Sequence, residues 1–283
     1  MNGVSKMAKK DNSKSITNVV PDLNVPAFMA EEEVLGIEAL KEFITPPFIK
    51  VIQKSAADEL LQVFNPGDVI LSPANALIAE MPRNEKGRTL EGAKTAFQII
   101  PLFFYVEWIT WNPIQLKGAE PSIVYRTIDP NDPIVAKSRS TTLRSEKHST
   151  RPELLIRHVE HMNFIVLLHK HELGSEPAIL SFSRGNWRAG SKFASLIQMR
   201  KAPIYGCVFD AIVSLRNNPK GDWYGYDMAN PEEGSPWVSE EEYAKCKELH
   251  EMFTKYHKEQ KIQAQYDVTT ETDDAATKAT DDF

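Results

Sequence analysis

Continuous apolar runs in the middle of the chain predict β-strands. The longest run, 97–111 (FQIIPLFFYVEWITW), is apolar at odd and even positions alike, which is typical of a central strand buried on both faces. Shorter runs are bounded by Asn, Pro and Gly, which favour turns. These runs predict further strands at 48–53, 67–71, 122–128, 163–168 and 178–183.

A β-hairpin is predicted closer to the C-terminal end. The segments 204–215 and 223–228 are strand-like, and 217–221 (NNPKG) between them is rich in turn-forming residues. By contrast, the polar segment 83–92 and the basic, proline-containing segment 129–152 are predicted to be loops.

Three helices are predicted. Apolar positions near a 3.6-residue spacing indicate one helix at 30–43 and a short one at 191–200. The third begins at Ser239, because Ser239 and Glu242 have the spacing of a capping box. An apolar stripe continues this helix to about Gln260.

Many short strands and few helices favour a mainly β fold of the α+β class. The specific architecture that we expect is an OB-fold-like Greek-key barrel with accessory helices. Three parts are expected along the chain: a flexible leader at 1–28, the barrel domain with insertions at 29–262, and a disordered acidic tail at 263–283.

The acidity of the chain is concentrated in its last residues. The formal net charge is -6. The stretch 267–283 has six acids and one Lys, a net charge of -5, which leaves -1 for the rest of the chain. The acidic composition therefore does not exclude a body that binds nucleic acid.

This acidic stretch ends in Asp281, Asp282 and Phe283. An acidic arm with one phenyl ring at its tip has the form of a peptide ligand, whose ring enters a pocket while its carboxylates meet Lys or Arg. The same arm can fold back on a cationic groove of its own protein and mimic phosphates. The alternative is a solubilising tail in which the last Phe has no role.

Two basic segments contain candidate contacts for nucleic acid. One lies in the predicted loop at 129–152, and the other, 183–201, contains no acid but includes a Trp. Single-strand binding requires cations that follow the phosphates and rings that stack on bases. The alternative is a solvated basic surface whose Trp lies in the core. The candidates are Arg139, Arg144 and Lys147 in the first segment, and Arg184, Trp187, Arg188, Lys192, Arg200 and Lys201 in the second.

Other aromatic residues are candidates for stacking on bases. On the hairpin, Trp223 and Tyr224 beside Lys220 are predicted to be exposed and to contact DNA. Trp108 and Trp111 belong to the two-faced apolar run, so most of that run is expected in the core. A DNA-facing role for one of its rings stays open.

Motifs for catalysis and for metal binding are missing. The sequence has no phosphate-binding Gly-rich loop, no G-x-S-x-G and no His-Glu-x-x-His. His158 and His161, three apart on a predicted strand, point to opposite faces, whereas a zinc site needs three or four converging ligands. The two cysteines are too distant in sequence to suggest a disulfide framework. We therefore expect no enzyme activity, no metal ion and no cofactor.

The chain resembles phage single-stranded-DNA-binding proteins of the T7 type. The tip Asp281-Asp282-Phe283 is similar to the ends of their acidic tails. In the body, the resemblance to phage OB-fold DNA binders covers 47–55 (PFIKVIQKS), 100–113 with its IPLFF and WNP sequences, and 157–164 (RHVEHMNF). This resemblance implies a barrel that binds single-stranded DNA and a tail that recruits replication proteins, such as DNA polymerase and primase–helicase.

The expected function is to coat and protect single-stranded DNA in phage replication and recombination, in the cytoplasm of the infected bacterial host. Expected partners are single-stranded DNA, replication proteins and, as an option, a second copy in a homodimer. No membrane span is expected, because no window approaches 18 apolar residues. The alternatives are a recombination mediator or annealing protein, and a phage structural or enzymatic protein whose tail is inert.

Deleting 267–283 tests the role of the tail. If the tail competes with DNA for a cationic groove, the truncated protein should bind a single-stranded oligonucleotide more tightly and should lose recruitment of replication proteins. Fluorescence anisotropy at low salt measures the first effect. Weaker DNA binding by the truncated protein would show that the tail does not compete.

Overall fold

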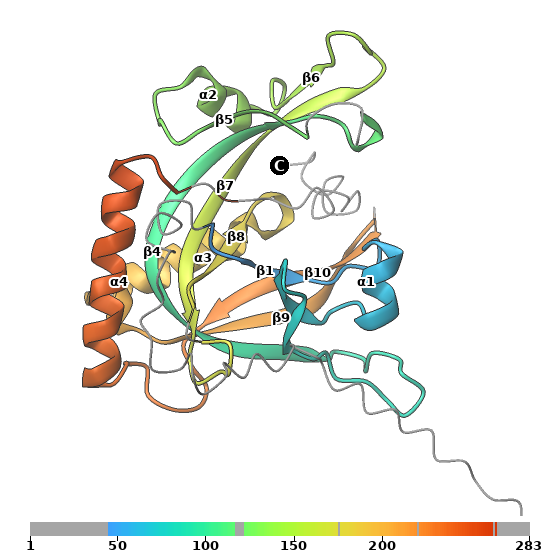
Figure 1. Ribbon diagram of the computed structural model, residues 1–283. Coiled ribbons are helices and arrows are strands. Elements are labelled where there is room, and N and C mark those ends of the chain that lie inside the picture. Colours follow the sequence, from blue (N-terminus) through green and yellow to red (C-terminus); the bar gives the residue numbers. More distant parts are fainter. Residues whose placement is uncertain (1–44, 117–121, 175, 220, 263, 265–283) are drawn as a thin grey trace, which may run out of the picture. The chain divides into compact units, whose positions relative to one another are not determined.

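The computed structural model is built around two long neighbouring strands, β4 (Lys94–Trp111) and β7 (Leu155–Leu168). Figure 1 shows them side by side and strongly curved. The structure describes residues 45–116, 122–174, 176–219, 221–262 and 264, all within the unit Gly36–Phe283. The predicted leader, the helix at 30–43 and the tail tip lie outside these residues.

The other elements are mostly short, and they connect or cover the two long strands. In chain order they are β1 (Phe48–Val51), α1 (Asp58–Val63), β2 (Val69–Ser72), β3 (Ala76–Ala79), the 3-10 turn Ile114–Leu116, β5 (Ile123–Thr127), α2 (Pro133–Arg139), β6 (Ser145–Lys147), β8 (Ala178–Phe182), the 3-10 turn Arg184–Asn186, α3 (Trp187–Arg200), the 3-10 turn Ile204–Gly206, β9 (Phe209–Asn218), β10 (Gly221–Ala229) and α4 (Glu240–Lys258).

The strands form one sheet in the order β10-β9-β4-β7-β8-β1-β2-β3, with β5 added to β4 and β6 added to β7. Neighbouring strands are antiparallel except β1 and β8, which are parallel. No ladder among the described strands joins β3 to β10, so the sheet is open. The mainly β, α+β class is therefore confirmed, whereas the closed OB-fold-like barrel is not.

Both faces of the long strands are buried, as their apolar pattern predicts. On one face Phe164 packs with Phe193 of α3, and on the other Ile165 packs with Phe253 of α4. Figure 1 shows α4 alongside β4. At the far end of β4 and β7, the strands β5 and β6 and the helix α2 extend this pair beyond the body of the sheet.

A side chain, not a ladder, joins the edge strand β10 to the chain after β1. The amide of Gln53 accepts a hydrogen bond from Tyr224 N at 2.9 Å and donates one to Tyr224 O at 2.8 Å. Gly67, at φ +96°, lies so close to Tyr224 that an added Cβ would stand 2.8 Å from its ring. Gln53 thus supplies the hydrogen bonds that a further strand would otherwise make.

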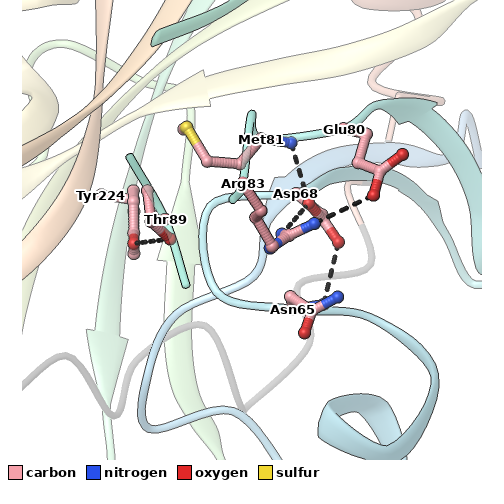
Figure 2. A network of polar contacts seen from close by, with 7 residues as sticks. All are labelled: Asn65, Asp68, Glu80, Met81, Arg83, Thr89 and Tyr224. Atoms are coloured by element: carbon pink, nitrogen blue, oxygen red, sulfur yellow. Dashed lines mark hydrogen bonds and ion pairs between the residues drawn. The ribbon is translucent and has the colours of Figure 1, made fainter. Parts of the chain in front are cut away.

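A buried ion pair fixes the segment that follows β3. Asp68 accepts hydrogen bonds from the backbone N–H groups of Asn65, at 2.8 Å, and Met81, at 2.9 Å, and it pairs with the guanidinium of Arg83 (Figure 2). Nearby, the hydroxyls of Thr89 and Tyr224 lie 3.3 Å apart. The polar segment 83–92, predicted as a loop, is therefore an ordered one.

The local predictions are mostly confirmed. The strands at 48–53, 67–71, 97–111, 122–128 and 178–183 are present with small shifts of their ends. The strand predicted at 163–168 is the second half of β7, which begins at Leu155, and the first hairpin strand begins at Phe209, because 204–206 is a 3-10 turn. Ser239 and Glu242 form both hydrogen bonds of the capping box. The prediction of a loop over 129–152 is wrong in part, because α2 and β6 lie within it.

The Gln53 bridge gives a stability prediction. In Gln53→Ala, the backbone N–H and C=O of Tyr224 both lose their hydrogen-bond partner while partly buried. The free energy of unfolding should therefore fall by about 2 kcal/mol. Gln62→Ala is the matched control, because Gln62 is exposed on α1 and its loss should change stability by less than about 0.5 kcal/mol. Urea denaturation measures both variants, and equal midpoints would show that the bridge contributes nothing.

Candidate nucleic-acid interface

The candidate site is built around Glu160 on β7. Glu160 stands directly opposite Trp108 of β4 in the antiparallel register, so both side chains lie on the same face. The indole N–H of Trp108 donates to Glu160 Oε2 at 2.9 Å. The Trp108 ring is buried against Ile134 and Val135 of α2, which fixes it beneath that helix.

The helix α2 supplies a cation to this place. Asp132 caps α2 by accepting from Ile134 N, and Pro133 occupies its first turn, where a missing N–H costs nothing. At the other end of α2, Arg139 Nε donates to Glu160 Oε2 at 2.7 Å, and its guanidinium lies 5.7 Å from the centroid of the Trp108 ring. The Arg139 side chain is 61% exposed, so most of its donors face solvent.

The beginning of α3 supplies an aromatic ring to the same carboxylate. Trp187 Nε1 lies 3.4 Å from Glu160 Oε1, and Trp187 is 43% exposed. Gly190 permits close packing here, because an added Cβ would stand 2.7 Å from Met162 and Phe182. Arg188, the next residue after Trp187, is exposed as well.

Trp108, Arg139, Glu160 and Trp187, hereafter the Glu160 cluster, bring the two predicted basic segments together. Arg139 comes from the first segment and Trp187 from the second, and each contacts one oxygen of the same carboxylate. Sequence reasoning missed Glu160, because an isolated acid on an apolar strand carries no pattern of its own.

Several other predicted contacts lie near the cluster or along its margins. The Arg144 carbonyl accepts from His158 N at 2.8 Å, two residues from Glu160. Lys147 is paired with Leu155, five residues from Glu160 and hence about 17 Å along the strand. Arg184 lies directly before α3. Lys192 is exposed but forms an ion pair with Asp227 at 2.8 Å.

The structure places four predicted contacts away from the Glu160 cluster. Trp223 and Tyr224 are consecutive residues of β10 and so point to opposite faces, and both are buried, so their predicted exposure is wrong. Arg200 holds the segment after β10: it donates to Pro236 O at 2.8 Å and lies between the rings of Phe209 and Trp237. Lys201 ends α3, about 20 Å from Trp187.

The remaining site predictions fall outside the described residues. They are Lys220, in the hairpin connection, and the tail tip Asp281, Asp282 and Phe283. Within the described part of the chain, no three His, Cys, Asp or Glu side chains gather as metal ligands would. His158 and His161 lie on opposite faces of β7, as their spacing predicts: His158 bonds Thr110 Oγ1 at 2.9 Å.

Basic side chains affect two titratable groups near this end of β7. Burial, together with the smaller effect of the positive charges of Arg184 and Arg126, lowers the pKa of His161 from its usual value of 6.5 to about 3. On the other side, Lys137 pairs with Glu146 at 2.7 Å and lowers the pKa of that carboxyl. Arg126 also pairs with Glu107, so cations and acids alternate in this region.

Comparison with family models places the chain in a phage family. The model of the Pam3 phage gp34-like protein matches residues 83–259, more than half of the chain. The chain belongs to the Pam3 phage gp34-like family. All four residues of the Glu160 cluster lie within the matched part. Comparisons with curated proteins and with solved structures found no match.

Among the helices that the structure describes, none is long and apolar enough to cross a membrane.

The buried His161 gives a pH prediction. Its pKa of about 3 in the folded chain lies below the unfolded value of 6.5, so only the unfolded chain binds this proton at pH 5. Between pH 7 and pH 5, this group should lower the free energy of unfolding by about 2 kcal/mol, and the effect should be absent above pH 7. In His161→Gln this part of the pH dependence should disappear. Urea denaturation at both pH values tests this. If the free energy of unfolding of His161→Gln changed between pH 7 and pH 5 as much as that of the unaltered protein, the prediction would be wrong.

Proposed function

We propose that the chain binds single-stranded DNA at the Glu160 cluster and along the basic residues that flank it. The observation that supports this most directly is the half-exposed Trp187 ring beside the exposed Arg139 guanidinium. A stacking ring next to a cation is the combination that binds single strands with little sequence preference. The remaining donors of Arg139 then meet phosphates or base edges.

The curved open sheet supports the same function. In OB folds, single strands lie across one face of a small barrel and its flanking loops. We propose a related mode, in which the Gln53 bridge takes the place of the backbone ladder that closes an OB barrel. Membership of a phage family agrees with a role in phage replication or recombination. Recruitment of replication proteins by the acidic tail is part of this proposal and rests on the sequence.

Trp187 gives the sharpest test, because a base that stacks on it should both add affinity and quench its fluorescence. It is one of five Trp residues, so replacing it separates its quenching from that of the other four. Trp187→Ala should weaken binding of an oligothymidine about tenfold, since stacking contributes roughly 1–3 kcal/mol per base. Trp187→Phe should keep most of the affinity, because a stacking ring remains, but should lose most of the fluorescence quenching.

Trp237→Ala is the matched control, because Trp237 is 46% exposed but packs on Arg200 outside the cluster. This variant should bind and quench as the unaltered protein does. Titrations at low and moderate salt measure all three variants. Wild-type affinity and quenching in Trp187→Ala would exclude the Glu160 cluster as the binding site.

A further inference from the structure

Glu160 has an oxygen with unused capacity as a hydrogen-bond acceptor. A carboxylate offers about four lone-pair sites on two oxygens. Oε2 accepts from Trp108 at 2.9 Å and from Arg139 at 2.7 Å. Oε1 accepts from Trp187 at 3.4 Å, longer than the usual 2.7–3.2 Å, and from no second donor within the described residues. A ligand with suitable donors can therefore bind Oε1 without displacing a strong hydrogen bond.

The geometry of Trp187 places a base within reach of this oxygen. The indole Nε1 lies 3.4 Å from Glu160 Oε1, and Trp187 as a residue is 43% exposed. A base that overlaps the edge of this ring and tilts toward Glu160 can direct one of its own edges at the same oxygen. The exposed ring and the carboxylate thus form a surface for a base together with its Watson–Crick edge.

The chemistry of a carboxylate selects among the bases. An ionised carboxylate only accepts hydrogen bonds. Guanine has two adjacent donors on its Watson–Crick edge, N1–H and the exocyclic N2 amino group. Adenine and cytosine have one amino donor beside an acceptor nitrogen, and thymine has one N–H between two carbonyls. Guanine is therefore the one base that offers two neighbouring donors to Glu160.

Arg139 complements the same edge. A guanidinium has five N–H donors, and the Nε–H of Arg139 is bonded to Glu160. Its other donors are on the side chain that is 61% exposed, next to the carboxylate. Guanine has an acceptor, O6, beside N1–H, so Arg139 can donate to O6 while Glu160 accepts from N1 and N2.

We propose that the Glu160 cluster recognises guanine within single-stranded DNA, with Trp187 stacking on the base and Glu160 reading its N1–H and N2 amino group. This inference rests on the proposed function and adds a base preference to it. The Glu160 carboxylate selects against thymine, because its negative charge then faces carbonyl oxygens without two donors in return.

The test compares three fluorescein-labelled 12-mers by anisotropy: oligothymidine, alternating guanine–thymine, and alternating inosine–thymine. Isolated guanines avoid guanine quadruplexes, and inosine lacks only the N2 amino group. The unaltered protein should bind the guanine oligonucleotide roughly tenfold more tightly than oligothymidine, as expected for a bidentate contact. The inosine oligonucleotide should fall between the two.

Glu160→Gln should reduce this preference to less than about twofold; the readout is the ratio of the affinities for the guanine oligonucleotide and for oligothymidine, because Glu160 also holds Arg139 and Trp187 and its replacement can lower both affinities. The matched control is Glu146→Gln, because Glu146 pairs with Lys137 near the cluster and its loss should leave the preference unchanged. Equal binding of all three oligonucleotides, or a full preference in Glu160→Gln, would overturn the guanine inference alone. If no oligonucleotide binds at low salt, the proposed function fails and this inference fails with it. The inosine comparison needs no variant, so it decides the matter even if Glu160→Gln does not fold.

Discussion

The register between β4 and β7 is the constraint on which the site depends. A bulge between Pro101 and Phe103 places one extra residue in β4, and the pairing beyond it sets Trp108 opposite Glu160. Because side chains alternate between faces, a slip by one residue would turn Trp108 away from Glu160. The carbonyl of Leu102, in the bulge, accepts from His250 Nδ1 of α4 at 2.7 Å. The helix on one face of the sheet therefore helps to set the register that builds the site on the other face.

The curvature of the long strands also depends on how the sheet ends. Residues 171 positions apart meet where Gln53 bonds both backbone groups of Tyr224. Tyr226 adds a hydrogen bond from its buried hydroxyl to Ile49 O at 3.3 Å. These contacts are made by single side chains, so they join β10 to β1 and to the residues directly after it without a backbone ladder. The described sheet therefore stays open. The fold thus reaches a strongly curved form with a few polar contacts of high sequence separation.

Elements with a strong local signal could be predicted from the sequence. The two-faced run 97–111 and the capping box at Ser239 carry their structure within a few residues. The helix α2 was missed although Asp132 and Pro133 form a recognisable start, because seven residues are too few to show an apolar period. The site could not be predicted as a whole: Arg139 and Trp187 were named, but their meeting at Glu160 depends on the bulge. Pro101 indicates an irregularity in this strand, but the sequence does not give the pairing of β4 with β7 beyond it.

An acid within a proposed DNA-binding surface reduces the attraction of that surface for phosphates, so Glu160 needs a physical reason within the proposed function. Arg139 and Trp187 come from two different helices, and each side chain would lose rotamer freedom on binding a ligand. Glu160 fixes both before any ligand arrives, with hydrogen bonds at 2.7 Å and 3.4 Å. The surface therefore loses some long-range attraction and gains a fixed arrangement of ring, cation and acceptor. An arrangement of this kind suits recognition of a base edge better than it suits binding of any polyanion, which is why the guanine inference follows from the same carboxylate that weakens the phosphate field.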